Sequence, residues 1–129
     1  SSGGNGGGLF SDARVSFSSG TAVSLTNSRA GNSTSAADGG ALSLSSLAVE
    51  DSALLIEGAR ASGAGGAVSA RGTGGVVFRQ SQVVLRDTSS VGDGGGIHTS
   101  SPLWSVTVVQ SNLSFDGTSA QGSGGGVAT

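Results

Sequence analysis

The sequence predicts an all-β protein, a parallel β-helix of about four coils with three short strands in each. Three observations lead to this fold class. A glycine-rich motif occurs five times in 129 residues, apolar residues alternate with polar ones between its copies, and the spacing of the apolar segments is nearly constant. The copies are 33, 26, 29 and 30 residues apart, which is typical of a solenoid or another stacked array.

The motif consists of two glycines, a glycine or alanine, and one aliphatic residue. Its copies are Gly6–Leu9, Gly39–Leu42, Gly65–Val68, Gly94–Ile97 and Gly124–Val127. A chain that turns sharply between stacked coils needs residues that accept positive φ and lack a Cβ atom. We expect turns here rather than a phosphate site, because the sequence has no Gly-x-Gly-x-x-Gly and no lysine for a Walker motif.

Each repeat contains three expected strands, and the first begins at the aliphatic residue of the motif. The second carries the alternating apolar pairs Val15/Phe17, Leu47/Val49, Val76/Phe78 and Val106/Val108. The third carries the pairs Val23/Leu25, Leu54/Ile56, Val83/Leu85 and Leu113/Phe115. A period of two indicates a strand with one buried face. Equivalent residues of successive coils should therefore stack about 4.8 Å apart.

The connections between the expected strands differ in length at one place. The last apolar residue of the third strand precedes the next motif by nine positions in three repeats and by fourteen in the first. Five residues are therefore inserted between Ala30 and Asp38, and we expect them to form a protruding loop. Small residues recur five positions after the third strand, which suggests a tight corner, and these are Ala30, Ala61, Ser90 and Ala120.

A helix is the competing interpretation of Ala41–Ala61. This segment is rich in Ala and Leu, and several of its apolar residues also fall at helical spacing. The aligned segments Val76–Thr88 and Val106–Thr118 are β-branched or aromatic instead, which favours strands. Because equal spacing implies one shared conformation, we expect strands in all repeats.

Composition excludes several classes of function. The chain has 6 basic and 8 acidic residues, a net charge of -2 and no basic run, which argues against a nucleic-acid partner. It has no cysteine for a disulfide or a thiolate site. No apolar stretch approaches the roughly 18 residues of a membrane span, so we expect no membrane insertion by this segment. Residues 1–129 form one β-helix segment, expected to be a section of a longer solenoid.

The segment Leu113–Val127 resembles the repeat of the polymorphic outer membrane proteins, which pairs a Gly-Gly-Ala-Ile motif with a Phe-x-x-Asn motif. The first motif matches well. In the second, the phenylalanine is present only at Phe115, and the asparagine position holds Ser28, Ala59, Thr88 or Thr118. The resemblance implies a right-handed, single-stranded β-helix in the exposed part of a large surface or autotransported protein. It implies a role in adhesion or display and no catalytic residue.

A charged column is the nearest feature to an active site. Glu57, Arg86 and Asp116 occupy equivalent outward positions, and Asp87 lies beside them. Carboxylates that hold calcium near an arginine base would suit a β-helix enzyme that cleaves acidic polysaccharides. Alternating signs also suit a solvated ladder that avoids like-charge contacts, and this is the reading we expect. No residue is therefore assigned to catalysis, to a metal or to a cofactor.

Other candidate contact residues are apolar or aromatic. Leu55, Val84 and Val77 should face outward and form an apolar stripe across two coils. Trp104, in the variable connection before the fourth repeat's second strand, is a candidate contact residue for protein or sugar. The single histidine, His98, is expected to be an inert residue on the outer side of the first strand.

Two Asn-x-Ser/Thr sequons are possible glycosylation sites, at Asn32 in the inserted loop and Asn112 in a turn. The expected function is a non-catalytic structural or adhesive module of a secreted or cell-surface protein. Its partner would be a protein, a glycan or a second copy stacked end to end. A fragment of a polysaccharide lyase or hydrolase is the first alternative. An ice-binding solenoid is the second, although the outward column of the first strand lacks a threonine array.

Overall fold

The computed structural model describes residues 7–31, 37–100 and 106–128, which contain only strands, turns and bends. One sheet comprises β1 (Leu9–Phe10), β5 (Leu42–Leu44), β9 (Val68–Ala70), β13 (Ile97–Thr99) and β17 (Val127–Ala128). A second comprises β2 (Arg14–Phe17), β6 (Ser46–Glu50), β10 (Val76–Arg79) and β14 (Val106–Val109). A third comprises β3 (Ala22–Thr26), β7 (Ala53–Glu57), β11 (Gln82–Arg86) and β15 (Asn112–Asp116). A fourth comprises β4 (Arg29–Ala30), β8 (Arg60–Ala61), β12 (Ser89–Ser90) and β16 (Ser119–Ala120).

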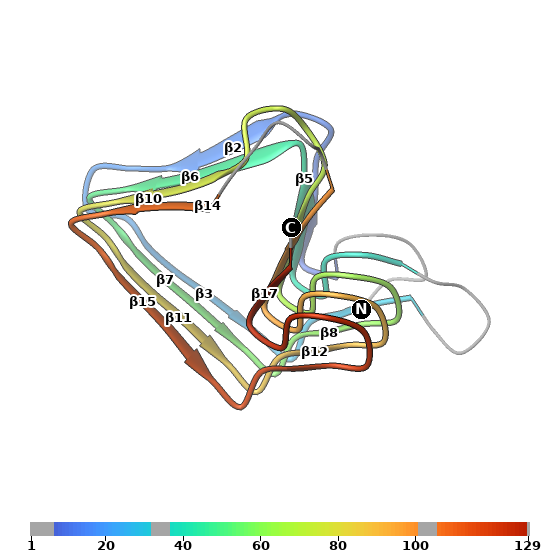
Figure 1. Ribbon diagram of the computed structural model, residues 1–129. Coiled ribbons are helices and arrows are strands. Elements are labelled where there is room, and N and C mark those ends of the chain that lie inside the picture. Colours follow the sequence, from blue (N-terminus) through green and yellow to red (C-terminus); the bar gives the residue numbers. More distant parts are fainter. Residues whose placement is uncertain (1–6, 32–36, 101–105, 129) are drawn as a thin grey trace.

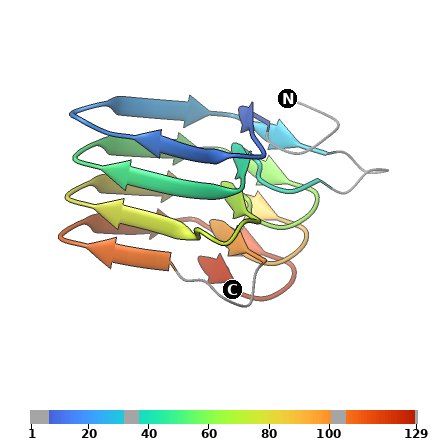
Figure 2. The same cartoon turned by 90° about the horizontal axis from the view of Figure 1, so that it is seen from above.

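The four sheets wrap into a right-handed parallel solenoid of about four coils, because each coil contributes one strand to every sheet and all pairs are parallel. Seen along its axis, the solenoid has three long sides formed by the first three sheets (Figure 1). Seen from the side, the coils lie one above another from the N-terminal to the C-terminal end (Figure 2). The predicted fold class is confirmed.

The fourth sheet is an addition to the three strands per coil that the sequence predicts. Its strands are only two residues long, and they pair in register through Ala30, Ala61, Ser90 and Ala120. These are the small residues that predict a tight corner. A two-residue strand contains one inward position and so has no detectable alternation, which is why the sequence did not predict these strands.

Strand register follows the apolar columns of the sequence. In the third sheet, Leu54 pairs with Val23 and Val83, and Val83 pairs with Leu113. The segment Ala41–Ala61 contains β5 to β8 rather than a helix, so the helical interpretation was wrong. Its neighbours on both sides form parallel strands in register, and backbone pairing with them outweighs the intrinsic helix preference of Ala and Leu.

The core is one continuous cluster of apolar side chains inside the coils. In the two central coils the inward residues of the first three sheets are at most 2% exposed, and the largest of these are Phe78, Leu42, Leu47, Leu54, Ile56 and Leu85. The equivalent residues of the terminal coils are only partly buried or exposed, as for Phe17, Phe115 and Val108. Burial therefore depends on having a coil on both sides.

The paired glycines of the motif meet two different requirements. Gly39, Gly65, Gly94 and Gly124 have φ between 65° and 70°, a conformation in which a Cβ atom is strained. The glycines that follow the first three of them, Gly40, Gly66 and Gly95, are constrained instead by backbone of the next coil. A Cβ atom on Gly66 would overlap the carbonyl oxygen of Gly95 in the next coil and lie 2.7 Å from the carbonyl of Ser89. The expected mechanical role of the motif is confirmed at these positions.

Candidate interaction face

Leu55 and Val84 lie together at the centre of the outer surface of the third sheet. They are direct register partners, both are half-buried, and Ser24 and Ser114 continue their column at either end. The small Ser24 leaves room beside Leu55 for a groove of about 430 Å³, lined at its edges by Ala22, Ala53, Gln82 and Arg86. We call Ser24, Leu55, Val84, Arg86 and the alanines around them the β7–β11 face.

Val77 does not belong to this face. It lies in β10, in the second sheet, with Ala48 and Thr107 as register partners. Figure 1 shows the second and third sheets meeting at a sharp corner, so their outer surfaces point in different directions. The expected stripe of Leu55, Val84 and Val77 is therefore a pair on one side of the solenoid and a separate half-buried valine on another.

The charged column borders the β7–β11 face. Arg86 is the register partner of both Glu57 and Asp116. Its Nη1 lies 3.4 Å from Glu57 Oε2, and its Nε lies 3.8 Å from Asp116 Oδ2. All three side chains are more than two-fifths exposed, so solvent screens the ion pairs and they contribute little stability. This geometry is that of a solvated ladder of alternating sign.

Asp87 has a conformational role next to the ladder. It has φ 52° and stands in a column of left-handed residues with Asn27, Gly58 and Gly117. A Cβ atom on Gly117 would approach Asp87 Oδ1, and one on Gly58 would lie 2.7 Å from Asn27 Oδ1. An Asn or Asp side chain thus extends over the glycine of the next coil. Among the described residues, no three acidic or histidine side chains group closely enough to hold a metal ion.

His98 is less exposed than the sequence suggests. Its column contains Ser43 and Ser69, which are 1% and 0% exposed. The glycine turns lie against this column, since a Cβ atom on Gly94 would be 3.0 Å from His98 Cβ. His98 Nδ1 and Ser69 Oγ are both buried without a hydrogen-bond partner in the part of the chain that the structure describes. The expectation of an outward-facing first-strand column was wrong for the central coils, and the column is not an exposed ladder of the kind that ice binding requires.

The sequence did not predict several side-chain hydrogen bonds that stabilise the turns and join neighbouring coils. The N–H groups of Ala64 and Ser123 each donate to a carboxylate in the preceding coil, to Asp38 Oδ1 and Asp93 Oδ1, at 2.7 Å. Within one turn of the chain, the buried Thr88 hydroxyl donates to the carbonyl oxygen of Gly95, seven residues later, at 2.8 Å. The only signal in the sequence is that both aspartates directly precede a glycine pair.

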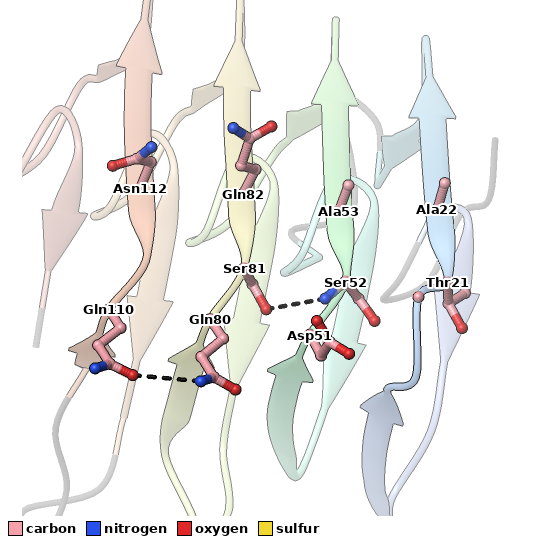
Figure 3. Close-up of a pocket in the computed structure, with 11 residues that line it drawn as sticks. Thr21, Ala22, Asp51, Ser52, Ala53, Gln80, Ser81, Gln82, Gln110 and Asn112 are labelled. Atoms are coloured by element: carbon pink, nitrogen blue, oxygen red, sulfur yellow. Dashed lines mark hydrogen bonds between the residues drawn. The ribbon is translucent and has the colours of Figure 1, made fainter.

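A serine column lines the corner between the second and third sheets. The Ser81 hydroxyl accepts from the Ser52 N–H at 3.3 Å (Figure 3), and the Ser111 hydroxyl accepts from the Ser81 N–H at 3.0 Å. Ser111 also donates to the carbonyl oxygen of Val109 at 2.8 Å. These bonds replace strand pairing where the chain bends, and they fix the position of the side chains at the corner.

Of the remaining candidate residues, the structure describes only Asn112. Asn112 is the exposed first residue of β15 and lines a groove of about 530 Å³ at the corner of the second and third sheets. Asn32, Trp104 and the expected protruding loop lie outside the described residues. The described residues form no helix and so include none of membrane-spanning length.

Comparison with known proteins adds no relative. No family model matches the chain, and no match is found among curated proteins or among solved structures. Functional inference therefore rests on the geometry described above and on the repeat pattern of the sequence.

Proposed function

We propose that the chain is a non-catalytic scaffold, a stretch of β-solenoid that presents fixed rows of side chains for contacts with other molecules. The observation that carries this proposal is the register. Across four coils, equivalent residues pair without slippage in all three long sheets. A surface of this kind is preorganised, so a partner that binds to it does not have to order it.

The β7–β11 face supports contact with a protein partner. Leu55 and Val84 give it an apolar centre, the groove beside Ser24 gives it shape, and Arg86 gives it a polar border. An apolar centre with a polar rim is the usual arrangement of a protein–protein interface. The partner that fits is a protein surface with an apolar side chain that enters the groove.

The state of Arg86 supports a non-catalytic role. A polysaccharide lyase built on the charged column would use this arginine as its base. Arg86 lies instead between two carboxylates, Glu57 and Asp116, on the neighbouring coils. The guanidinium is therefore flanked by carboxylates on both sides rather than free to approach a substrate.

The site of action that we propose is the cell surface or the extracellular space. The support is the resemblance of the repeat to surface proteins of the autotransporter type. If the source organism has N-glycosylation, Asn112 is the described sequon that is exposed enough to be modified.

The test of the scaffold function compares adhesion and turnover in one set of proteins. Beads coated with the chain are measured for binding to cell surfaces, using wild type, the double variant Leu55→Asp/Val84→Asp, and Val77→Asp as the control on another side. We expect adhesion to fall only in the double variant, because a carboxylate in the apolar centre opposes burial. Cleavage of polysaccharides by wild type that is lost in Arg86→Ala would contradict the proposal.

A further inference from the structure

The corner between the second and third sheets has polar side chains at a place where glycine would be easier to accommodate. In each of the four coils one residue other than glycine has a positive φ at this corner, and it is Ser19, Asp51, Gln80 or Gln110; the first coil also has a glycine there, Gly20. The motif turns use glycine at every one of their positive-φ positions. In a chain with 25 glycines, a side chain kept in a left-handed conformation four times over indicates that the side chains themselves have a use.

These side chains form part of a row of amides. Gln80 Nε2 donates to Gln110 Oε1 at 3.4 Å, so the two amides are stacked on neighbouring coils. Gln82 and Asn112, which are register partners, stand in parallel at the start of the next strands (Figure 3). We call Asp51, Gln80, Gln82, Gln110 and Asn112 the amide corner. All five are exposed, and they line the groove of about 530 Å³.

The amide corner has a rigid base. Ser52, Ser81 and Ser111 lie directly beneath it. The hydroxyls of Ser81 and Ser111 accept from the N–H groups of Ser52 and Ser81 in the preceding coil, and the Ser111 hydroxyl also donates to a carbonyl oxygen of its own coil. The amides of Gln80 and Gln110, and those of Gln82 and Asn112, are therefore one coil spacing apart, about 4.8 Å, along the axis of the solenoid. A ligand that follows this row must be extended and must offer both donors and acceptors, because each amide has both.

The chemistry of the groove selects among such ligands. The groove lining includes no basic residue, and its one charged residue is Asp51, so an acidic ligand is repelled. Its apolar side chains are only Ala22 and Ala53, which provide no pocket for a peptide anchor. The strands beside the corner are paired on both sides in the central coils, so no free edge is available there for an added peptide strand.

We propose that the amide corner binds a neutral, hydroxyl-rich oligosaccharide that lies along the solenoid axis. Planar amides can hydrogen-bond adjacent hydroxyl groups of one sugar ring, and successive amides then meet successive rings. The inference rests on the proposed scaffold function and adds a ligand class to it. Because the groove contains no aromatic side chain for stacking, binding of a short oligosaccharide is weak, with a Kd on the order of 1 mM.

The experiment is NMR titration of the chain, made without a glycan on Asn112 as checked by intact mass. The probes are linear hexasaccharides of glucose, mannose, galactose and N-acetylglucosamine, each added to about 10 mM, with oligogalacturonate as the acidic comparison. We expect at least one neutral probe to shift the side-chain amide signals of Gln80, Gln82, Gln110 and Asn112. The signal of Gln121, which follows β16 on another side, should stay unchanged.

A double variant separates binding from folding. Gln80→Gly/Gln110→Gly removes two amides at positions where glycine is conformationally favoured, so thermal stability should be equal to or above that of wild type. Affinity for the neutral probe should fall about tenfold or more, whereas Gln121→Ala should leave it unchanged. Equal affinity in the double variant would overturn the assignment of the site.

Other outcomes distinguish this inference from the scaffold function. If no neutral probe shifts the amide signals, or if the acidic probe binds more tightly than all neutral ones, the amide corner is not a neutral glycan site and the scaffold function is unaffected. If a hexasaccharide is shortened during the titration, as read by mass spectrometry, the chain is catalytic and the scaffold function fails.

Discussion

At the scale of single residues, the clearest constraint is on the second glycine of those motifs that pack against a following coil. Its φ does not require glycine, so a conformational argument from the sequence accounts only for the first glycine of the pair. The constraint comes from the next coil, whose carbonyl groups occupy the space where a Cβ atom of Gly40, Gly66 or Gly95 would be. Each of these positions therefore has room for glycine alone.

This geometry predicts a large effect for one methyl group. Gly66→Ala should destabilise the fold by about 3 kcal/mol or more, because the overlap is with backbone that cannot turn away. Gly125→Ala is the matched control. It is the same position of the last motif, where the nearest atom to an added Cβ is Thr118 O at 3.5 Å, and it should cost less than about 1 kcal/mol. Chemical denaturation of both variants measures the difference, and equal losses would show that the coils do not stack as described.

At the scale of strands, the alternation of inward and outward residues determines how much stability a substitution removes. Leu54 is 1% exposed and its neighbour Leu55 is half-buried on the other side of the same strand, β7. We predict that Leu54→Ala costs about 2–5 kcal/mol, whereas Leu55→Ala costs less than about 1 kcal/mol. Thermal melts of the two variants test this, and a reversed order would mean that β7 presents its opposite face to the core.

A second prediction at the scale of strands concerns the stability of variants in the charged column of Glu57, Arg86 and Asp116. Arg86→Glu would place three carboxylates in one column and should lower stability by about 1 kcal/mol at low salt, with recovery near about 1 M salt. Arg86→Gln is the control, and it should change stability by less than about 0.5 kcal/mol because exposed ion pairs contribute little. Urea denaturation at two salt concentrations measures both. Stabilisation of Arg86→Glu by calcium would instead indicate that the column can become a metal site.

The sequence predicts the structure well where a feature recurs in every coil. It does not predict the burial or position of a side chain that depends on the backbone of a neighbouring segment. The apolar pair in each strand is repeated four times, so its register could be aligned directly. The burial of Ser69 and of His98 Nδ1 could not be predicted, because glycine turns cover them and a turn without side chains has no apolar pattern in the sequence. The separation of Val77 from Leu55 depends on a corner whose residues are exposed and polar. The hydrogen bond of Asp93 joins residues 30 positions apart, which only the coil length relates.

At the scale of the whole molecule, stability should be highest in the middle. A solenoid behaves as a row of coils in which each contacts only its neighbours, so the terminal coils open first. The inward residues of β6, β7, β10 and β11 are at most 2% exposed, whereas those of the first and fourth coils are only partly buried or, for Val108, exposed. We predict slower amide exchange in residues 46–57 and 76–86 than in 14–26 and 106–116. Uniform exchange across all four coils would indicate a single cooperative unit instead.

The central claim is that side chains one coil apart stack in rows on defined sides of a solenoid. Paired cysteines test it directly, because the natural sequence contains none. Pyrene attached at Leu55→Cys and Val84→Cys should give strong excimer emission, since these residues are register partners. Pyrene attached at Leu55→Cys and Val77→Cys should give only monomer emission, since the two residues lie in different sheets. Equal emission from the two pairs, or excimers only from the second, would contradict the fold and the interaction face built on it.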